Sequence, residues 1–222
     1  MTDSAKIKMI YGGVALISAF ILGMSWFLTT LKMEQRANRP PMVDQGKEEA
    51  GDLNVLDQEI DLERQDGTPF KLSELNDKVW LAVQFYVTCP MCAERNAAKL
   101  VKIYREFQDD PDFRVVCLSV DPEEDTEEKL QEVRDLLEVD SSNWFFVKAE
   151  REELWDYMRK EMLFADIRER TVPAEIAAKG RWAHDLGIQV YRGNVLVDHW
   201  RDGGNLDSLR DEIKEALAQL NQ

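Results

Sequence analysis

The feature that most restricts the possible folds of this sequence is an apolar run that ends at a pair of cysteines. Residues Val79 to Val87 (VWLAVQFYV) are almost continuously apolar and rich in β-forming side chains. Such a run is typical of a central strand that is covered on both faces. It leads directly into Cys89 and Cys92, which have two residues between them, and a helical pattern follows them. The sequence therefore predicts a buried strand, a tight turn with two thiols, and a helix.

The spacing of the two cysteines at this junction has a chemical consequence. Pro90 suits the first position of a helix, where no backbone donor is needed. Free N–H groups and the helix dipole stabilise a thiolate there, so Cys89 is expected to be a nucleophile or a soft metal ligand. Cys92 returns to the same helix face, within reach of a disulfide or a shared metal ion. The spacing is therefore compatible with a redox-active pair and with a metal site. The alternative is that both thiols are buried structural residues.

The remaining periodicity predicts an α/β domain. A short hairpin is expected over residues 60–72, strands over 114–120 and 144–147, and a second hairpin over 188–200. Helices are expected over 126–137, 152–162 and 206–220, with Thr126 as an N-cap. The order implies parallel strands with right-handed crossovers in the middle. This is the layout of a thioredoxin-like fold with an N-terminal β-hairpin extension.

The N-terminal part of the chain predicts a membrane anchor. Residues 9–31 contain no charged side chain and would form a helix of roughly 34 Å, enough to cross a bilayer. A buried soluble helix is the alternative. We therefore expect an N-terminal tail (residues 1–8), a transmembrane helix (9–31), a polar linker (32–54) and the thioredoxin-like domain (55–222).

The charge of the sequence excludes one class of binding partner but does not predict the orientation of the chain in the membrane. The net charge of -15, with 43 acidic against 28 basic residues, argues against nucleic-acid binding. Basic residues flank both ends of residues 9–31 in similar numbers, so charge does not decide which side faces the cytoplasm. Thiol chemistry favours a domain outside the cytoplasm of a single-pass membrane protein. The bacterial periplasmic side is favoured, and the mitochondrial inner membrane is the alternative.

Three further residues could carry chemistry. Cys117 lies within an apolar strand pattern and is expected in the core, although a resolving thiol or a third ligand is the alternative. His184 and His199 are the only two histidines. His199 falls within a strand and is expected to be structural. His184 precedes the closing hairpin, at a loop end that should pack against the cysteine turn, where an imidazole could bind a metal or tune the thiols.

Several segments together resemble the Sco/SenC family, whose members help assemble the binuclear copper centre of cytochrome c oxidase. These segments are VQFYVTCPMC, LSVDPEEDTEEKLQEV, NWFF followed by ELW, and His184 just before IQVYRGNVLVDHW. The resemblance extends over most of residues 55–220. It departs from the family pattern in having two residues between the cysteines instead of three, and Ala183 in place of an aspartate before the histidine.

The resemblance implies a copper site. Two cysteines and one histidine bind Cu(I) or Cu(II) in that family, and the matching positions here are Cys89, Cys92 and His184. It also implies a partner, either the subunit that carries the copper centre of cytochrome c oxidase or another thiol protein.

Four functions remain as hypotheses. The first is a copper-binding assembly factor, and the second is a metal-free thiol-disulfide oxidoreductase that uses Cys89 and Cys92. The third is a thiol peroxidase, which would need Thr or Ser at the position where this chain has Tyr86. The fourth is a domain that only makes contacts.

Overall fold

The structure is a computed structural model that describes residues 54–201 and 204–220. Its centre is a seven-stranded sheet in the order β2-β1-β5-β4-β3-β8-β9. The strands are β1 (Leu62–Arg64), β2 (Pro69–Phe70), β3 (Val79–Phe85), β4 (Phe113–Ser119), β5 (Trp144–Lys148), β8 (Ile188–Arg192) and β9 (Val195–Trp200). Strands β3, β4 and β5 run parallel, and the outer pairings are antiparallel. The predicted parallel middle and both predicted hairpins are present.

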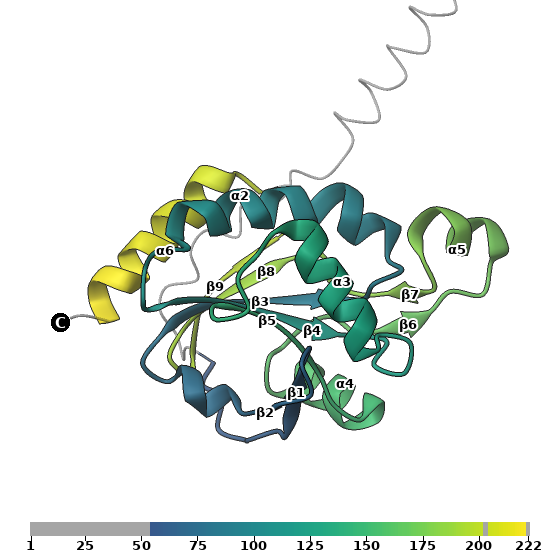
Figure 1. The fold of residues 1–222 in the computed structure, drawn as a ribbon, viewed down its shortest axis with the longest axis horizontal. Coiled ribbons are helices and arrows are strands. Elements are labelled where there is room, and N and C mark those ends of the chain that lie inside the picture. Colours follow the sequence, from purple (N-terminus) through teal and green to yellow (C-terminus); the bar gives the residue numbers. More distant parts are fainter. Residues whose placement is uncertain (1–53, 202–203, 221–222) are drawn as a thin grey trace, which may run out of the picture. The chain divides into compact units, whose positions relative to one another are not determined.

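Helices cover both faces of this sheet (Figure 1). On one face lie α2 (Ala98–Phe107), α3 (Glu127–Leu137) and α6 (Leu206–Leu220), and on the other lie α4 (Arg151–Lys160) and the short 3-10 turn η1 (Leu72–Leu75). Alternate residues of β3 are therefore buried on opposite sides. Val79 and Leu81 face the α2 side, while Trp80 and Ala82 face the α4 side. Burial on both faces explains why this strand reads as a continuous apolar run.

Most predicted boundaries agree with the structure to within two residues. Thr126 caps α3, because its hydroxyl oxygen accepts a hydrogen bond from the Lys129 N–H at 3.4 Å. Helix α6 has the predicted bounds. The strand predicted to reach Val87 ends at Phe85, because the following residues already turn towards Cys89.

A small arm between α4 and β8 was not predicted. It consists of β6 (Arg168–Glu169), α5 (Pro173–Lys179) and β7 (Trp182–Ala183), and it extends from one end of the domain in Figure 1. Helix α5 has no buried residue. The arm escaped prediction because its strands are two residues long and its helix has no apolar face that a periodicity would reveal.

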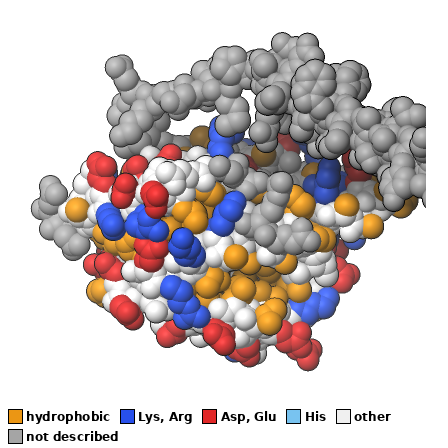
Figure 2. Space-filling view, turned by 90° about the horizontal axis from the view of Figure 1, so that it is seen from above, with side chains coloured by type: hydrophobic (Ala, Val, Ile, Leu, Met, Phe, Trp, Pro, Cys, Tyr) orange, Lys and Arg blue, Asp and Glu red, His pale blue; other side chains and the backbone are white. Residues whose placement is uncertain are grey.

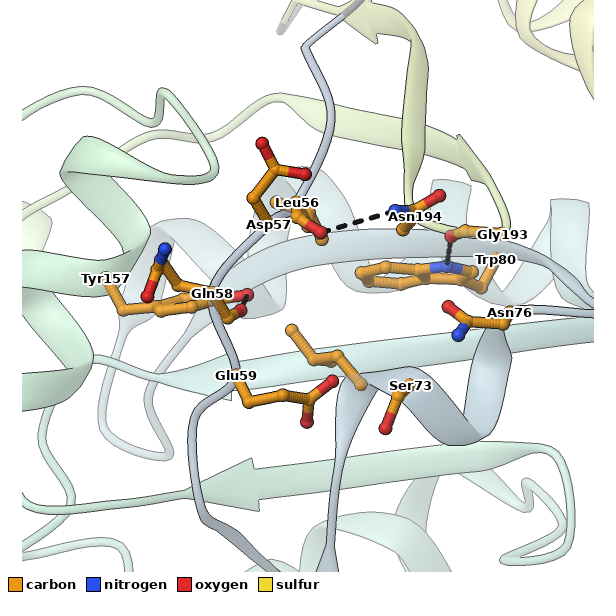
Figure 3. Close-up of a pocket in the computed structure, with 11 residues that line it drawn as sticks. Leu56, Asp57, Gln58, Glu59, Ser73, Asn76, Trp80, Tyr157, Gly193 and Asn194 are labelled. Carbon is orange, nitrogen blue, oxygen red and sulfur yellow. Dashed lines mark hydrogen bonds between the residues drawn. The ribbon is translucent and has the colours of Figure 1, made fainter.

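A polar pocket of about 240 Å³ lies under the β8–β9 turn (Figure 3). The Trp80 indole N–H donates to the Gly193 carbonyl oxygen at 2.7 Å, and the Asn194 amide donates to the Leu56 carbonyl oxygen at 3.3 Å. These bonds attach the β8–β9 turn to the sheet and to the segment before β1. Neither a thiol nor an imidazole lines this pocket.

The predicted tail, membrane anchor and nearly all of the predicted linker lie outside the described residues. Within residues 54–201 and 204–220, no helix combines the length and the apolar character needed to cross a membrane.

Candidate metal and thiol centre

The cysteine turn is built by the chain on either side of it. Strand β3 delivers residues 86–88 into a turn, and the Cys89 N–H donates to the Tyr86 carbonyl oxygen at 3.1 Å. Helical structure begins at Pro90, as predicted. The backbone N–H of Cys92 donates to the Cys89 sulfur at 3.0 Å, so this sulfur occupies the place of an N-cap oxygen. Cys89 is therefore fixed at the helix N-terminus.

The helix after the turn starts irregularly. Residues Cys92–Ala97 form a π-helical segment, η2, before α2 continues as a regular α-helix. Segments of this kind are rare and are frequently found at functional sites. Here the segment bears Cys92 at its first position, and both Cys89 and Cys92 are buried, with 2% and 6% of their surfaces exposed.

His184 meets both sulfurs. Its Nε2 atom lies 3.4 Å from the Cys89 Sγ and 3.4 Å from the Cys92 Sγ. Its Nδ1 atom lies 2.6 Å from the carbonyl oxygen of Asp185. A carbonyl oxygen only accepts, so Nδ1 carries a hydrogen and Nε2 is the atom that faces the sulfurs. Nε2 binds a metal ion through its lone pair, and it donates to a thiolate when it carries a hydrogen. This is the orientation that metal-ligating histidines adopt when the other ring nitrogen is held by a backbone carbonyl.

The electrostatics of the pair are asymmetric. A hydrogen bond from the Cys92 thiol, and then one from His184, lower the pKa of Cys89 to about 5 in spite of its burial. The neighbouring Cys89 sulfur and burial raise the pKa of Cys92 far above its ordinary value. At neutral pH Cys89 is therefore the thiolate, and Cys92 keeps its proton until Cys89 has reacted or a metal has bound.

The three donor atoms form a suitable set for a soft metal ion. One sulfur each from Cys89 and Cys92 and a nitrogen from His184 all lie within 4.8 Å of one another. Among the described residues no other group of three or more His, Cys, Asp or Glu side chains comes together in this way. Two thiolates and an imidazole match the preferences of copper and zinc rather than of calcium or magnesium.

The loop that carries His184 is attached to the sheet and to η2. The side-chain oxygen of Gln84, at the end of β3, accepts a hydrogen bond from the Asp185 N–H at 2.7 Å. The Asn96 amide of η2 donates to the Leu186 carbonyl oxygen at 2.9 Å. Both bonds hold the backbone next to His184. Sequence reasoning missed Gln84 and Asn96, and the only signal was a polar residue, Gln84, within an otherwise apolar strand.

Asp185 and His199 form a second layer behind His184. One Asp185 carboxylate oxygen accepts from the Gly187 N–H at 2.7 Å, and the other lies 3.5 Å from the His199 Nε2. Burial acts to raise the pKa of Asp185, but His199 and the Gly187 N–H outweigh it and hold that pKa at about 2. His199, predicted to be structural, therefore supports the loop of the candidate site.

Backbone carbonyls close the arm at the end that leads into the same loop. The guanidinium of Arg170 donates to the carbonyl oxygens of Gly180 at 3.0 Å and of Trp182 at 2.5 Å. The Tyr86 hydroxyl bonds the Trp182 peptide, accepting from its N–H at 3.3 Å. Burial, followed by the charge of Cys89, raises the pKa of Tyr86 to about 12. Tyr86 thus fixes the loop and offers no acidic hydroxyl to the thiols, which weighs against the peroxidase hypothesis.

Cys117 is a core residue of β4, as predicted, with 2% of its surface exposed. Burial raises its pKa, so it remains a thiol at neutral pH. It is not part of the donor cluster.

Comparison with known proteins shows which family this domain resembles. The SCO1/SenC family model matches residues 48–145, which include both cysteines. The predicted resemblance to the Sco/SenC family is confirmed. His184 lies beyond the matched segment, so its assignment rests on the geometry given above. A sequence search of curated proteins finds no match.

Solved structures of Sco proteins resemble this chain along most of their length. An SCO1/SenC family lipoprotein from Bacillus anthracis is 19% identical, with a TM-score of 0.63, and the likeness covers 74% of this chain and 96% of that one. BsSco, described as a member of the Sco family of cytochrome c oxidase assembly proteins, is 21% identical with a TM-score of 0.60, covering 75% and 96%. Arabidopsis thaliana ScoI, solved with copper bound, is 18% identical with a TM-score of 0.59, covering 74% and 99%. At these identities the likeness establishes the mixed α/β, thioredoxin-like fold of Sco proteins.

Proposed function

We propose that this Sco-like protein binds copper through Cys89, Cys92 and His184 and delivers it during assembly of the copper centre of cytochrome c oxidase. The observation that carries the proposal is the position of the His184 Nε2, 3.4 Å from both sulfurs, with the Nδ1 atom held by the Asp185 carbonyl oxygen. Thiolates favour Cu(I), and imidazole also accepts Cu(II). Copper is then the cargo, and the cysteines of a partner protein are its destination.

Two comparisons support this proposal. Arabidopsis thaliana ScoI has been solved with copper bound, and BsSco is described as one of the cytochrome c oxidase assembly proteins. The partner proposed for this chain is the subunit that carries the copper centre, or another thiol protein that serves it.

We place the domain outside the cytoplasm, attached by a membrane anchor at residues 9–31. The uncharged sequence of that segment supports an anchor. A similar Sco protein is described as a lipoprotein, which supports membrane attachment of this domain as well.

The test is retention of Cu(I) by the full-length protein under anaerobic, reducing conditions, in competition with a strong chelator. We expect about one copper per chain, and loss of copper in Cys89→Ser, Cys92→Ser and His184→Ala. Cys117→Ala is the matched control, because it removes a buried thiol outside the donor cluster and should keep the copper. Copper retained by His184→Ala at unchanged affinity would remove His184 from the proposed ligands.

A second candidate is thiol-disulfide exchange without metal, and the lowered pKa of Cys89 favours it. The Cys89 thiolate would attack a target disulfide, form a mixed disulfide and release one target thiolate. Cys92, after losing its proton, would then attack the Cys89 sulfur and release the second. The target disulfide gains two electrons as Cys89 and Cys92 become a disulfide. If the protein is a thiol-disulfide oxidoreductase, His184→Ala should leave the rate of thiol-disulfide exchange nearly unchanged. If it binds copper, His184→Ala should weaken copper retention.

A further inference from the structure

An apolar pocket of about 140 Å³ lies directly beside the cysteine pair. Cys89 and Cys92 form part of its wall, and Cys117 and Phe146 line it from the sheet. Its volume is close to that of a cavity that accepts a benzene ring, about 150 Å³. The space therefore suits one apolar side chain next to the reactive sulfur.

The mouth of the pocket lies on the face covered by η2, α2 and α3. Leu136 of α3 lines the pocket while 82% of its surface is exposed, the highest exposure of any large apolar side chain in the described part of the chain. Ala93 of η2, also exposed, lines the pocket as well. Figure 2 shows hydrophobic side chains gathered on this face among Lys, Arg, Asp and Glu. Exposed apolar side chains around an apolar hollow are characteristic of a binding site.

One polar group in the wall lacks a partner. Asn96 is buried, with 8% of its surface exposed, and its amide nitrogen is used by the Leu186 carbonyl oxygen. Its Oδ1 atom is buried and accepts no hydrogen bond from any described residue. Gln84 also lines the pocket, but its side-chain amide is bonded at both ends, to Met158 and to Asp185. Leaving a buried acceptor without a donor is unfavourable, so a bound N–H group would be stabilised there.

We propose that this pocket binds a target polypeptide by one large apolar residue adjacent to the target's cysteine. The apolar side chain fills the pocket, and the backbone N–H of that residue donates to the Asn96 Oδ1. Because Cys89 and Cys92 both line the pocket, a residue bound there lies next to the target cysteine along the chain. The inference rests on the proposed function in one respect, namely that Cys89 meets a cysteine of a partner protein.

The test is a competition between two peptides on the full-length Cys92→Ser protein, which cannot resolve a mixed disulfide. The peptides are Ac-Ala-Phe-Cys-Ala-amide and Ac-Ala-Ser-Cys-Ala-amide, each supplied as its disulfide-linked dimer. The Cys89 thiolate attacks a dimer, one copy stays bound as a mixed disulfide, and the other leaves as a thiolate. Mass spectrometry of the protein at equilibrium gives the ratio of the two adducts.

We expect the phenylalanine peptide to be enriched about tenfold or more, from the burial of one aromatic side chain. Leu136→Ser should reduce this enrichment and, as a change at an exposed position, should leave the fold intact. Val172→Ser is the matched control, since Val172 is also an exposed apolar residue, 50% exposed, but does not line the pocket. N-methylation of the phenylalanine removes the donor for Asn96 and should also lower the enrichment.

Equal trapping of both peptides, an unchanged ratio in Leu136→Ser, or no trapping at all would overturn the inference. Binding of free indole or benzene that displaces no peptide would instead identify the pocket as a site for small apolar molecules, and would equally overturn it. Copper retention by the wild-type protein from the same preparation separates the two ideas. If copper is retained but both peptides are trapped equally, the pocket inference fails and the proposed function is unaffected. If neither copper nor peptide is bound, both the pocket inference and the proposed function fail.

Discussion

The cysteine turn and the His184 loop meet at one site but are held there in different ways. The turn follows from its neighbours along the chain, because a buried strand precedes Cys89 and its sulfur caps the helix that follows. The loop is held by side chains distant in sequence, above all Gln84 and Asn96. Damage to those distant contacts should therefore displace His184 while leaving the thiols in place, and the following predictions test this difference.

The largest effect is expected from Gly180→Ala, at the base of the loop. Gly180 has a φ of +81°, and a Cβ atom there would lie 2.0 Å from the buried hydroxyl oxygen of Tyr86. Strain and overlap together should lower the free energy of unfolding by about 3–4 kcal/mol. Urea denaturation of residues 50–222 measures this, and the double variant with Tyr86→Phe should recover part of the loss. A full, additive loss in the double variant would contradict the proposed overlap.

Asp125→Asn tests the cysteine turn. The buried Asp125 carboxylate accepts from the Val87 N–H at 3.0 Å and from the Ser119 hydroxyl at 2.6 Å, and burial raises the pKa of Asp125 to about 6. The folded protein thus keeps a proton on Asp125 up to about pH 6, whereas the unfolded chain loses it near pH 4. This group therefore makes the wild type less stable as pH rises through that interval.

The asparagine of Asp125→Asn does not ionise, so the variant does not lose stability at this position as pH rises. Relative to the wild type, its free energy of unfolding should rise by about 2–3 kcal/mol between pH 4 and pH 7. Denaturation of both proteins at both pH values gives the difference, in which other titrating groups cancel. A constant difference would mean that Asp125 is ionised in the fold throughout.

Gln84→Leu should weaken copper binding without changing the thiols. It removes the acceptor for the Asp185 N–H beside His184. Loss of a group that supports a metal ligand typically lowers metal affinity 10- to 100-fold, or about 1.4–2.7 kcal/mol. Chelator competition measures the affinity, and alkylation of Cys89 should proceed at the wild-type rate.

Gln189→Leu is the matched control for that change. Gln189 is also a buried glutamine of the sheet, but its amide bonds the Met162 carbonyl oxygen and its oxygen accepts from Tyr191. It should lower stability and leave copper affinity unchanged. Equal loss of affinity in both variants would attribute the effect to general destabilisation.

The smallest effect concerns the thiolate itself. In the metal-free, reduced protein the rate of Cys89 alkylation by iodoacetamide should stay level from pH 8 to pH 6 and halve near pH 5, because the pKa of Cys89 is lowered to about 5. His184→Ala should move the midpoint upward, since His184 contributes to that lowering. A rate that climbs steadily between pH 7 and pH 9 would show an ordinary thiol.

The central strand, the helix caps and the chemistry of the cysteine pair could all be predicted from the sequence. These depend on neighbouring residues: an apolar run fixes β3, Pro90 fits the first helical position, and Thr126 caps α3. His184 was selected from its place before the closing hairpin and from the Sco/SenC resemblance, and the structure brings it to both sulfurs.

The contacts that hold and surround the site could not be predicted from the sequence, because they form only in the folded domain. The roles of Gln84, Arg170 and His199 arise from contacts between residues far apart in the chain, and single side chains without a repeating pattern give no periodic signal. The arm of β6, α5 and β7 is too short and too exposed to be read from hydrophobicity. The pocket beside the cysteines is formed by η2, α3 and the sheet together, so no one segment of the sequence contains it.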